Sequence, residues 1–271
     1  MNRAWASLAV TLTIQALVSM ALLTLPVMAP VVAQALGVSP ALVGLYVAIV
    51  YAGAMLASLL AGTAEARFGA IRISQLGLVS CAAGLALCAV PSVACLAVGA
   101  LLIGLGYGPV TPASSHLLAR STPAHRMSLV FSVKQTGVPL GGALAGAIVP
   151  GLMLAWGWQA ALLAVAAANL LCAAVAQPLR AGLDADREPG RRLAAGSLAQ
   201  PVRTVLAHPA LRMLAGMSFV FSFAQLSLTT YLVTYLNTTL AYGLVAGGLA
   251  ADPPRGRRAG GGGGGGGVGG G

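Results

Sequence analysis

The sequence predicts an all-α integral membrane protein, and its composition and charge spacing both support this fold class. Of its 271 residues, 58% are hydrophobic and 7% are charged, whereas about a quarter of the residues in soluble domains are charged. The mean hydropathy is +0.89. Charged residues are absent from long intervals, which cover 4–64, 73–119, 135–179 and 213–251. These properties are typical of a protein that crosses a bilayer several times.

The charge-free intervals predict how many helices cross the membrane. One crossing needs about 20 apolar residues, so each of the first three intervals accommodates two helices joined by a turn. Glycine, proline, serine or tryptophan residues mark these turns at 37–40, 91–92 and 156–159. The expected helices are 7–35, 42–63, 73–90, 93–117, 128–154 and 159–177, with a seventh at 212–236.

The composition changes along the chain, and these changes predict its domain organisation. Residues 1–177 form a six-helix transmembrane bundle, and 178–211, rich in charge, proline and glycine, form a solvated linker. Residues 212–250 contain the seventh helix and the start of an eighth. The glycine-rich segment 251–271 is expected to be disordered, because polyglycine buries too little apolar area to offset its chain entropy.

The arginines are sorted to one side of the predicted membrane. They lie at the N-terminus and in the connections near 64–72, 118–127 and 178–211, while the opposite connections carry no charge. Under the positive-inside rule, the N-terminus and these connections are cytoplasmic. This predicts a multi-pass plasma (inner) membrane protein, and it explains the net charge of +10 without a nucleic-acid partner. The cysteines lack metal-ligand spacing, so neither a metal nor a cofactor is expected.

The stretch 132–146 is the most informative part of the sequence. Lys134 is the only charged residue that lies clearly inside an apolar segment of the sequence. An ionisable group at membrane depth is a candidate for function. Pro139 removes a backbone donor and allows the helix to bend. Small residues spaced four apart let neighbouring helices approach closely, and here they are Gly137, Gly141, Gly142 and Gly146.

Polar side chains within the predicted helices are candidates for lining a substrate pathway. These are Lys134, Gln15, Gln135, Tyr107, Gln225 and Ser222. Two alternatives remain open. The polar groups on the first and seventh helices would also suit interhelical hydrogen bonds. The Lys134 side chain would also be long enough to extend toward the cytoplasmic face. If Lys134 faces a cavity, its charge attracts an anionic group of a solute.

The connection after the second helix carries a recognisable pattern of glycines and charges. Gly62, Arg67, Gly69 and Arg72 match the loop signature between helices 2 and 3 of the major facilitator superfamily, which the chain resembles. The family's aspartate falls on Ala66, and Glu65 stands one place earlier. Glu65 and Arg67 alone would otherwise be interpreted as a solvated surface pair.

Two further segments are similar to signatures of this superfamily. The spacing of Gly137, Pro139, Gly141 and Gly142 is similar to a Gly-Pro-x-x-Gly-Gly signature that is associated with exchangers. The family's fourth helix usually carries an arginine four residues before a Gly-x-Gly pair, and Ala100 occupies that position here. Since that arginine is tied to proton coupling, its absence argues against a proton-driven assignment.

The resemblance implies a secondary active transporter that moves a small organic solute by alternating access between two six-helix halves. Its partners would be the lipid bilayer, the solute and a coupling ion. Because family members continue for five more helices, the chain resembles the N-terminal half plus helix 7 of a C-terminally truncated member. A non-transporting fragment is therefore the alternative function. An integral-membrane enzyme is a more distant one, since the predicted helices contain no nucleophile–base pair.

Overall fold

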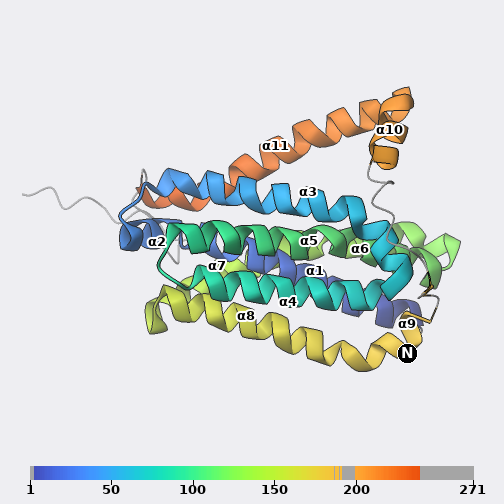
Figure 1. The fold of residues 1–271 in the computed structure, drawn as a ribbon, viewed down its shortest axis with the longest axis horizontal. Helices are drawn as coiled ribbons and strands as arrows, with labels where there is room; N and C mark the ends of the chain where they lie inside the picture. The colour runs from blue at the N-terminus through green and yellow to red at the C-terminus, as the bar shows by residue number, and fades with distance from the viewer. Residues whose placement is uncertain (1–2, 186, 189, 191–198, 239–271) are drawn as a thin grey trace, which may run out of the picture.

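A computed structural model describes residues 3–185, 187–188, 190 and 199–238 (Figure 1). These residues form α-helices and short 3-10 helices without any strand among them, so the prediction of an all-α fold is confirmed. The described part contains seven helical segments that are long and apolar enough to cross a membrane. The expected start of helix 8, the tail 251–271, and linker residues such as Asp186, Arg191 and Arg192 lie outside the described residues.

The first predicted helix, 7–35, is interrupted in the structure. Helix α1 (Arg3–Val27) ends before Met28, and α2 (Ala29–Leu36) follows it. Pro30 lacks the N–H that would bond the carbonyl of Pro26, which removes one hydrogen bond of the helix at this point. A left-handed Gly37, with φ of 65°, ends α2. The short η1 (Pro40–Leu42) then leads into α3 (Val43–Phe68).

The fifth predicted helix, 128–154, is also divided. After η2 (Ala124–Arg126), α6 (Met127–Gln135) and α7 (Gly137–Trp156) are separated at Thr136. Pro139 explains the interruption, because it lacks the N–H that would bond the carbonyl of Gln135. The remaining crossings of the bundle are single helices, namely α4 (Ala70–Cys88), α5 (Val93–Ser121) and α8 (Trp158–Val175).

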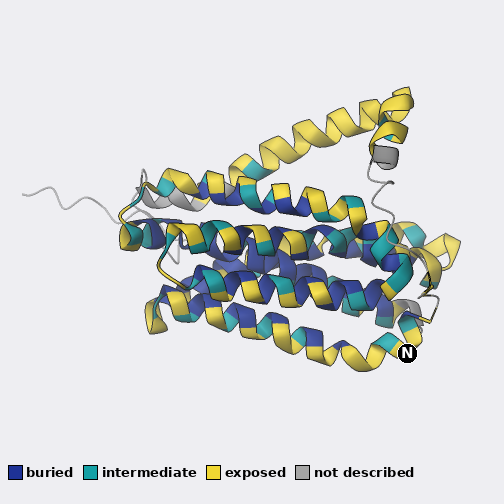
Figure 2. Cartoon of the chain, viewed as in Figure 1, coloured by how far each residue is buried: buried dark blue, intermediate teal, exposed yellow. Residues whose placement is uncertain are grey.

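Helix α5 lies at the centre of the bundle. It packs between α3 and α4, while α1 packs on α7 and α8 packs on α4. Figure 2 shows that the buried residues concentrate on the faces these helices turn toward one another. The main apolar core joins side chains from α1, α3, α4, α5, α7 and α8. The arrangement therefore leaves the interior of the bundle, rather than a loop, as the place for a buried site.

The contact between α3 and α5 depends on a glycine and a proline of α5. A Cβ atom at Gly108 would overlap the carbonyl oxygen of Ala54, so only glycine permits this approach. Pro112 removes the N–H that would normally bond the Gly108 carbonyl. The Ser58 hydroxyl of α3 lies 3.0 Å from this carbonyl and 2.7 Å from that of Ala54. A side chain from α3 thus satisfies the acceptor that the proline leaves open.

Replacing Ser58 tests this compensation. We expect Ser58→Ala to lower the free energy of unfolding by about 1 kcal/mol, the usual contribution of one hydrogen bond. In a Pro112→Ala background the cost should be smaller, because residue 112 then donates to Gly108 itself. Reversible unfolding in mixed detergent micelles, applied to all four members of the cycle, measures the coupling. An identical cost in both backgrounds would contradict this account.

The last described segments leave the bundle. After η3 (Gln177–Leu179) and α9 (Arg180–Leu183), the described chain resumes with α10 (Ala199–Ala207) and α11 (Pro209–Thr238). Helix α11 begins away from the bundle, beside α10, and approaches it toward its C-terminal end, with contacts to α1 and α3 (Figure 1). Its described side chains are largely exposed, including Met213, Phe219 and Phe221. Exposed apolar residues on all sides are typical of a helix that is surrounded by lipid or other helices.

Candidate functional site

Lys134 lies inside the bundle. Its side chain on α6 is 2% exposed, and the ammonium donates to the Thr111 carbonyl at 3.2 Å and to the Ser115 hydroxyl at 2.9 Å. Both partners belong to α5, where Thr111 lies between Pro109 and Pro112 and Ser115 follows Pro112 by three residues. Thr111 is about 14 Å from Arg120 along the helix axis, at 1.5 Å per residue. The alternative that Lys134 extends to the end of the helix is therefore wrong.

Gln15 of α1 joins the same group of polar side chains. It is 1% exposed, and its Oε1 accepts a hydrogen bond from the Thr111 hydroxyl at 3.2 Å. A Cβ at Gly137 would lie 3.0 Å from the Cβ and Cγ of Gln15, so the glycine at the start of α7 leaves room for this side chain. Thr111 thus links Gln15 to Lys134. We call Gln15, Thr111, Ser115 and Lys134 the Lys134 cluster.

The Lys134 cluster contains more hydrogen-bond donors than acceptors. An ammonium carries three N–H donors, and Lys134 has two protein acceptors. The buried Nε2 of Gln15 has no hydrogen-bond partner among the described residues. Within the described part of the chain, no carboxylate pairs with the Lys134 ammonium. Because a buried cation is unfavourable unless paired, this arrangement suits the binding of an anionic group.

The other predicted pathway residues take different positions. Tyr107 lies one turn before Thr111 on α5, and its ring packs edge-on against Tyr51 with centroids 6.2 Å apart. The structure therefore places Tyr107 beside the Lys134 cluster. Gln135 is exposed on α6, and Ser222 and Gln225 are exposed on α11, so these three do not join it.

Sequence reasoning did not place Thr111 and Ser115 in the site. Both were visible as hydroxyl residues four apart on the helix, a spacing that puts them on one face. Each lies within three residues of Pro109 or Pro112, two prolines that remove donors from α5. A pair of hydroxyls on a proline-interrupted helix was the signal that could have found them.

The loop predicted to carry the 62–72 motif forms different pairs from those expected. Glu65 pairs with His116 of α5 at 2.8 Å, with side-chain exposures of 8% and 56% respectively. The interpretation of Glu65 and Arg67 as a solvated pair is wrong. Instead, the Arg67 guanidinium lies 5.2 Å from the centroid of the Phe68 ring. The pairing differs because Glu65 faces α5 at the end of α3, where His116 is one of the nearest bases.

Asp184 caps the start of α4 from a distant part of the chain. It was expected in a solvated linker, yet it is 2% exposed. Its carboxylate accepts hydrogen bonds from the backbone N–H groups of Ile71 at 2.8 Å and Arg72 at 3.0 Å. The N-cap position itself is Gly69, which has no side chain to do this and adopts φ of 93°. A Cβ at Gly69 would overlap the Asp184 carboxylate, so the glycine is needed for space as well as conformation.

Removing this cap should weaken the fold. We expect Asp184→Ala to lower the free energy of unfolding by about 1–2 kcal/mol, as N-cap losses do. Asp184→Asn keeps one acceptor oxygen and should lose less. Thermal unfolding of the purified variants in detergent, followed by tryptophan fluorescence, gives the order of stabilities. Equal stability of the wild type and Asp184→Ala would show that the cap contributes nothing.

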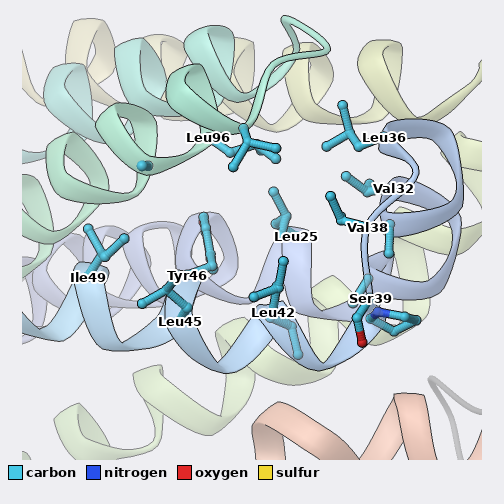
Figure 3. Close-up of a pocket in the computed structure, with 16 residues that line it drawn as sticks. Leu25, Val32, Leu36, Val38, Ser39, Leu42, Leu45, Tyr46, Ile49 and Leu96 are labelled. Carbon is cyan, nitrogen blue, oxygen red and sulfur yellow. The ribbon is translucent and has the colours of Figure 1, made fainter.

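A separate apolar pocket lies at the other end of the bundle, beside α2 and the starts of α3 and α5 (Figure 3). It is open on one side, and its empty space of about 600 Å³ includes the solvent at its mouth. Ser39 is its one polar side chain apart from Tyr46. None of its lining residues belongs to the Lys134 cluster. The described residues also contain no group of three His, Cys, Asp or Glu side chains that would hold a metal ion.

The fold defines the class as a multi-pass helical membrane protein, with a cluster of polar side chains buried inside its bundle. The sequence model of the Major Facilitator Superfamily matches residues 11–252, and the chain belongs to this family. Among curated protein sequences, none matches this chain.

Solved transporter structures have a similar fold. A bacterial homologue of the human lysosomal transporter Spinster, in an inward-facing and occupied conformation, aligns with a TM-score of 0.67 at 18% identity, over 92% of this chain and 57% of its own. A peptide transporter of the POT type in complex with sulfate gives 0.56 at 19%, over 88% and 47%. The POT family transporter PepTSo gives 0.53 at 19%, over 91% and 50%. The chain therefore spans about half the length of the transporters it matches.

Proposed function

We propose that the chain serves secondary active transport of a small organic solute with an anionic group, and that the Lys134 cluster contacts this group. The observation that carries the proposal is the buried Lys134 ammonium, whose described partners are neutral. An anionic solute group would supply the missing acceptor and the missing negative charge. A charged hydrogen bond of this kind contributes about 1.5–3 kcal/mol.

The depth of the cluster supports this assignment. Thr111 is about 14 Å from Arg120 along α5, and Gln15 is about 18 Å from Arg3 along α1, at 1.5 Å per residue. Both distances correspond to about half of a 30 Å hydrocarbon core. Solute sites near the bilayer midplane, formed at interrupted helices, are common in secondary transporters.

Helix geometry next to the cluster supports alternating access as the mechanism. The interruption at Thr136 separates α6 from α7 two residues after Lys134. On α7, a Cβ at Gly141 would overlap the Ala16 carbonyl oxygen, so α7 lies directly against the backbone of α1. We propose that a hinge at Thr136 and sliding along this close contact change access to Lys134. The solute would move against a coupling ion or a second solute.

Uptake into proteoliposomes tests the transport proposal. The purified chain is reconstituted, and uptake of labelled small carboxylates, neutral sugars and amines is compared with that of empty liposomes under imposed proton and sodium gradients. We expect at least one carboxylate to accumulate above the empty-liposome level and the amines not to. Failure of every solute to accumulate would overturn transport by this chain. Accumulation of neutral solutes alone would overturn the anionic assignment.

We also propose that the N-terminus and the arginine-rich end of the bundle face the cytoplasm. Arg67, Arg72 and Arg120 lie at adjacent helix ends, which supports this orientation under the positive-inside rule. A cysteine introduced at the exposed Gly190 tests it. We expect an impermeant thiol reagent to label this cysteine in opened but not in intact cells. Labelling in intact cells would reverse the orientation.

A further inference from the structure

Three arginines surround a hollow at the arginine-rich end of the bundle. The hollow is open to solvent, and its lining consists of Arg67, Phe68, Arg180 and Arg187. The arginines come from the end of α3, from α9 and from the segment that follows α9. The lining carries three positive charges and no carboxylate. The hollow is separate from the Lys134 cluster, with which it shares no residue.

Backbone and side-chain contacts hold these segments together. The Asp184 carboxylate binds the first turn of α4, which fixes the segment after α9 beside the end of α3. The Glu188 N–H donates to the Ala66 carbonyl at 2.7 Å, so the chain on either side of Arg187 is anchored. Arg67 is held over the Phe68 ring. The fold thus positions the side chains of Arg67 and Arg180 and the backbone of Arg187.

The nearby acids are largely occupied by other contacts. Asp184 accepts two backbone hydrogen bonds, and its Oδ2 lies 3.7 Å from the Arg180 Nε. Glu65 pairs with His116. Glu188 is exposed beside the hollow, and it is not part of the lining. The local charge therefore remains positive around the space itself, although Asp184 and Glu188 lie next to it.

We infer that this hollow binds a phosphate group. Guanidinium groups form paired hydrogen bonds that match the oxygens of phosphate, and they do so better than ammonium groups. Basic pockets at the ends of membrane helices are also suited to phospholipid headgroups. The same chemistry fits a lipid phosphodiester and a soluble phosphate. This site goes beyond the transport function, because it requires no residue of the Lys134 cluster.

Binding to the delipidated full-length chain in detergent tests the inference. Native mass spectrometry measures retention of phosphatidylglycerol against phosphatidylcholine, and calorimetry measures inorganic phosphate. The test variant is Arg67→Gln/Arg180→Gln/Arg187→Gln. The control variant, Arg126→Gln/Arg203→Gln/Arg212→Gln, removes the same charge from exposed positions outside the hollow. We expect the test variant to bind at least about tenfold more weakly than the wild type, and the control to bind like the wild type.

The outcomes separate the two phosphate sources. Retention of phosphatidylglycerol without binding of inorganic phosphate identifies a lipid headgroup, whereas inorganic phosphate binding identifies a soluble ligand. Equal weakening in both variants, or no binding to the wild type, would overturn the inference. If the test variant does not fold, Arg187→Glu replaces it, because Arg187 is exposed and its reversal leaves the Asp184 contacts in place. Unchanged binding by folded Arg187→Glu would overturn the inference as well.

Discussion

Replacing Lys134 by methionine is expected to reduce the uptake of an anionic solute at least about tenfold and to leave the fold intact. The loss follows because a hydrogen bond to a charged group contributes about 1.5–3 kcal/mol, and every 1.4 kcal/mol changes affinity tenfold. The fold should not suffer, because the ammonium is buried without a described carboxylate partner. An unpaired buried charge is unfavourable, so an apolar side chain of similar volume removes this cost. Proteoliposome uptake and thermal unfolding of the same preparation measure both effects.

A charge control accompanies this variant. Arg126→Gln removes one positive charge from the exposed turn before α6 and touches no residue of the Lys134 cluster. Its uptake should equal that of the wild type. Wild-type uptake by Lys134→Met would remove Lys134 from the solute site. A large loss of uptake in Arg126→Gln would show that net charge, rather than position, determines transport.

Replacing Gly141 by alanine is expected to destabilise the bundle by about 1–3 kcal/mol, the range for overpacked interiors. The added Cβ would overlap the Ala16 carbonyl and would lie 2.6 Å from the Cβ of Ser19 and 2.8 Å from the backbone nitrogen of Met20. Because two of these neighbours are backbone atoms, α1 and α7 must move apart to admit the methyl group. Reversible unfolding in mixed micelles measures the free energy.

Gly151 on the same helix provides the matched control. No atom lies within 4 Å of a Cβ built there. Gly151→Ala should therefore be neutral or stabilise α7 by up to about 1 kcal/mol, since alanine is the better helix former. If both variants lose the same stability, the close contact between α1 and α7 is not the cause.

The number and order of the membrane helices were predictable from the sequence, because charged residues are rare in segments that cross the bilayer core. The interruption at Met28 was not predicted, and near Thr136 a bend at Pro139 was predicted but not a division into two helices. Each interruption lies just before a proline, Pro30 or Pro139. This proline has no N–H to bond the carbonyl four residues earlier in the chain. Hydropathy alone does not reveal such an interruption, because the segment around the proline remains apolar enough to cross the membrane.

The candidate site was predictable in part. Lys134 stands out as a charge in an apolar segment, and Gln15 as an amide in one. Their connection through Thr111 depends on how α1 and α6 pack on α5, which no spacing along the chain reveals. Asp184 was missed for the same reason, since its partners Ile71 and Arg72 belong to another helix. A carboxylate at a helix N-terminus is a common cap. Here it could not be recognised from the sequence, because Asp184 is 113 residues from Ile71 at the helix start that it caps.

The Asp184 cap also constrains the order of events during synthesis. Asp184 follows Ile71 by 113 positions, so a ribosome that has just released α4 has not yet made the group that completes its first turn. Until residue 184 emerges, the amides of Ile71 and Arg72 must be bound by water or lipid headgroups at the bilayer surface. The nascent α4 becomes fully bonded only when the sixth crossing is in place, which couples early insertion to late assembly.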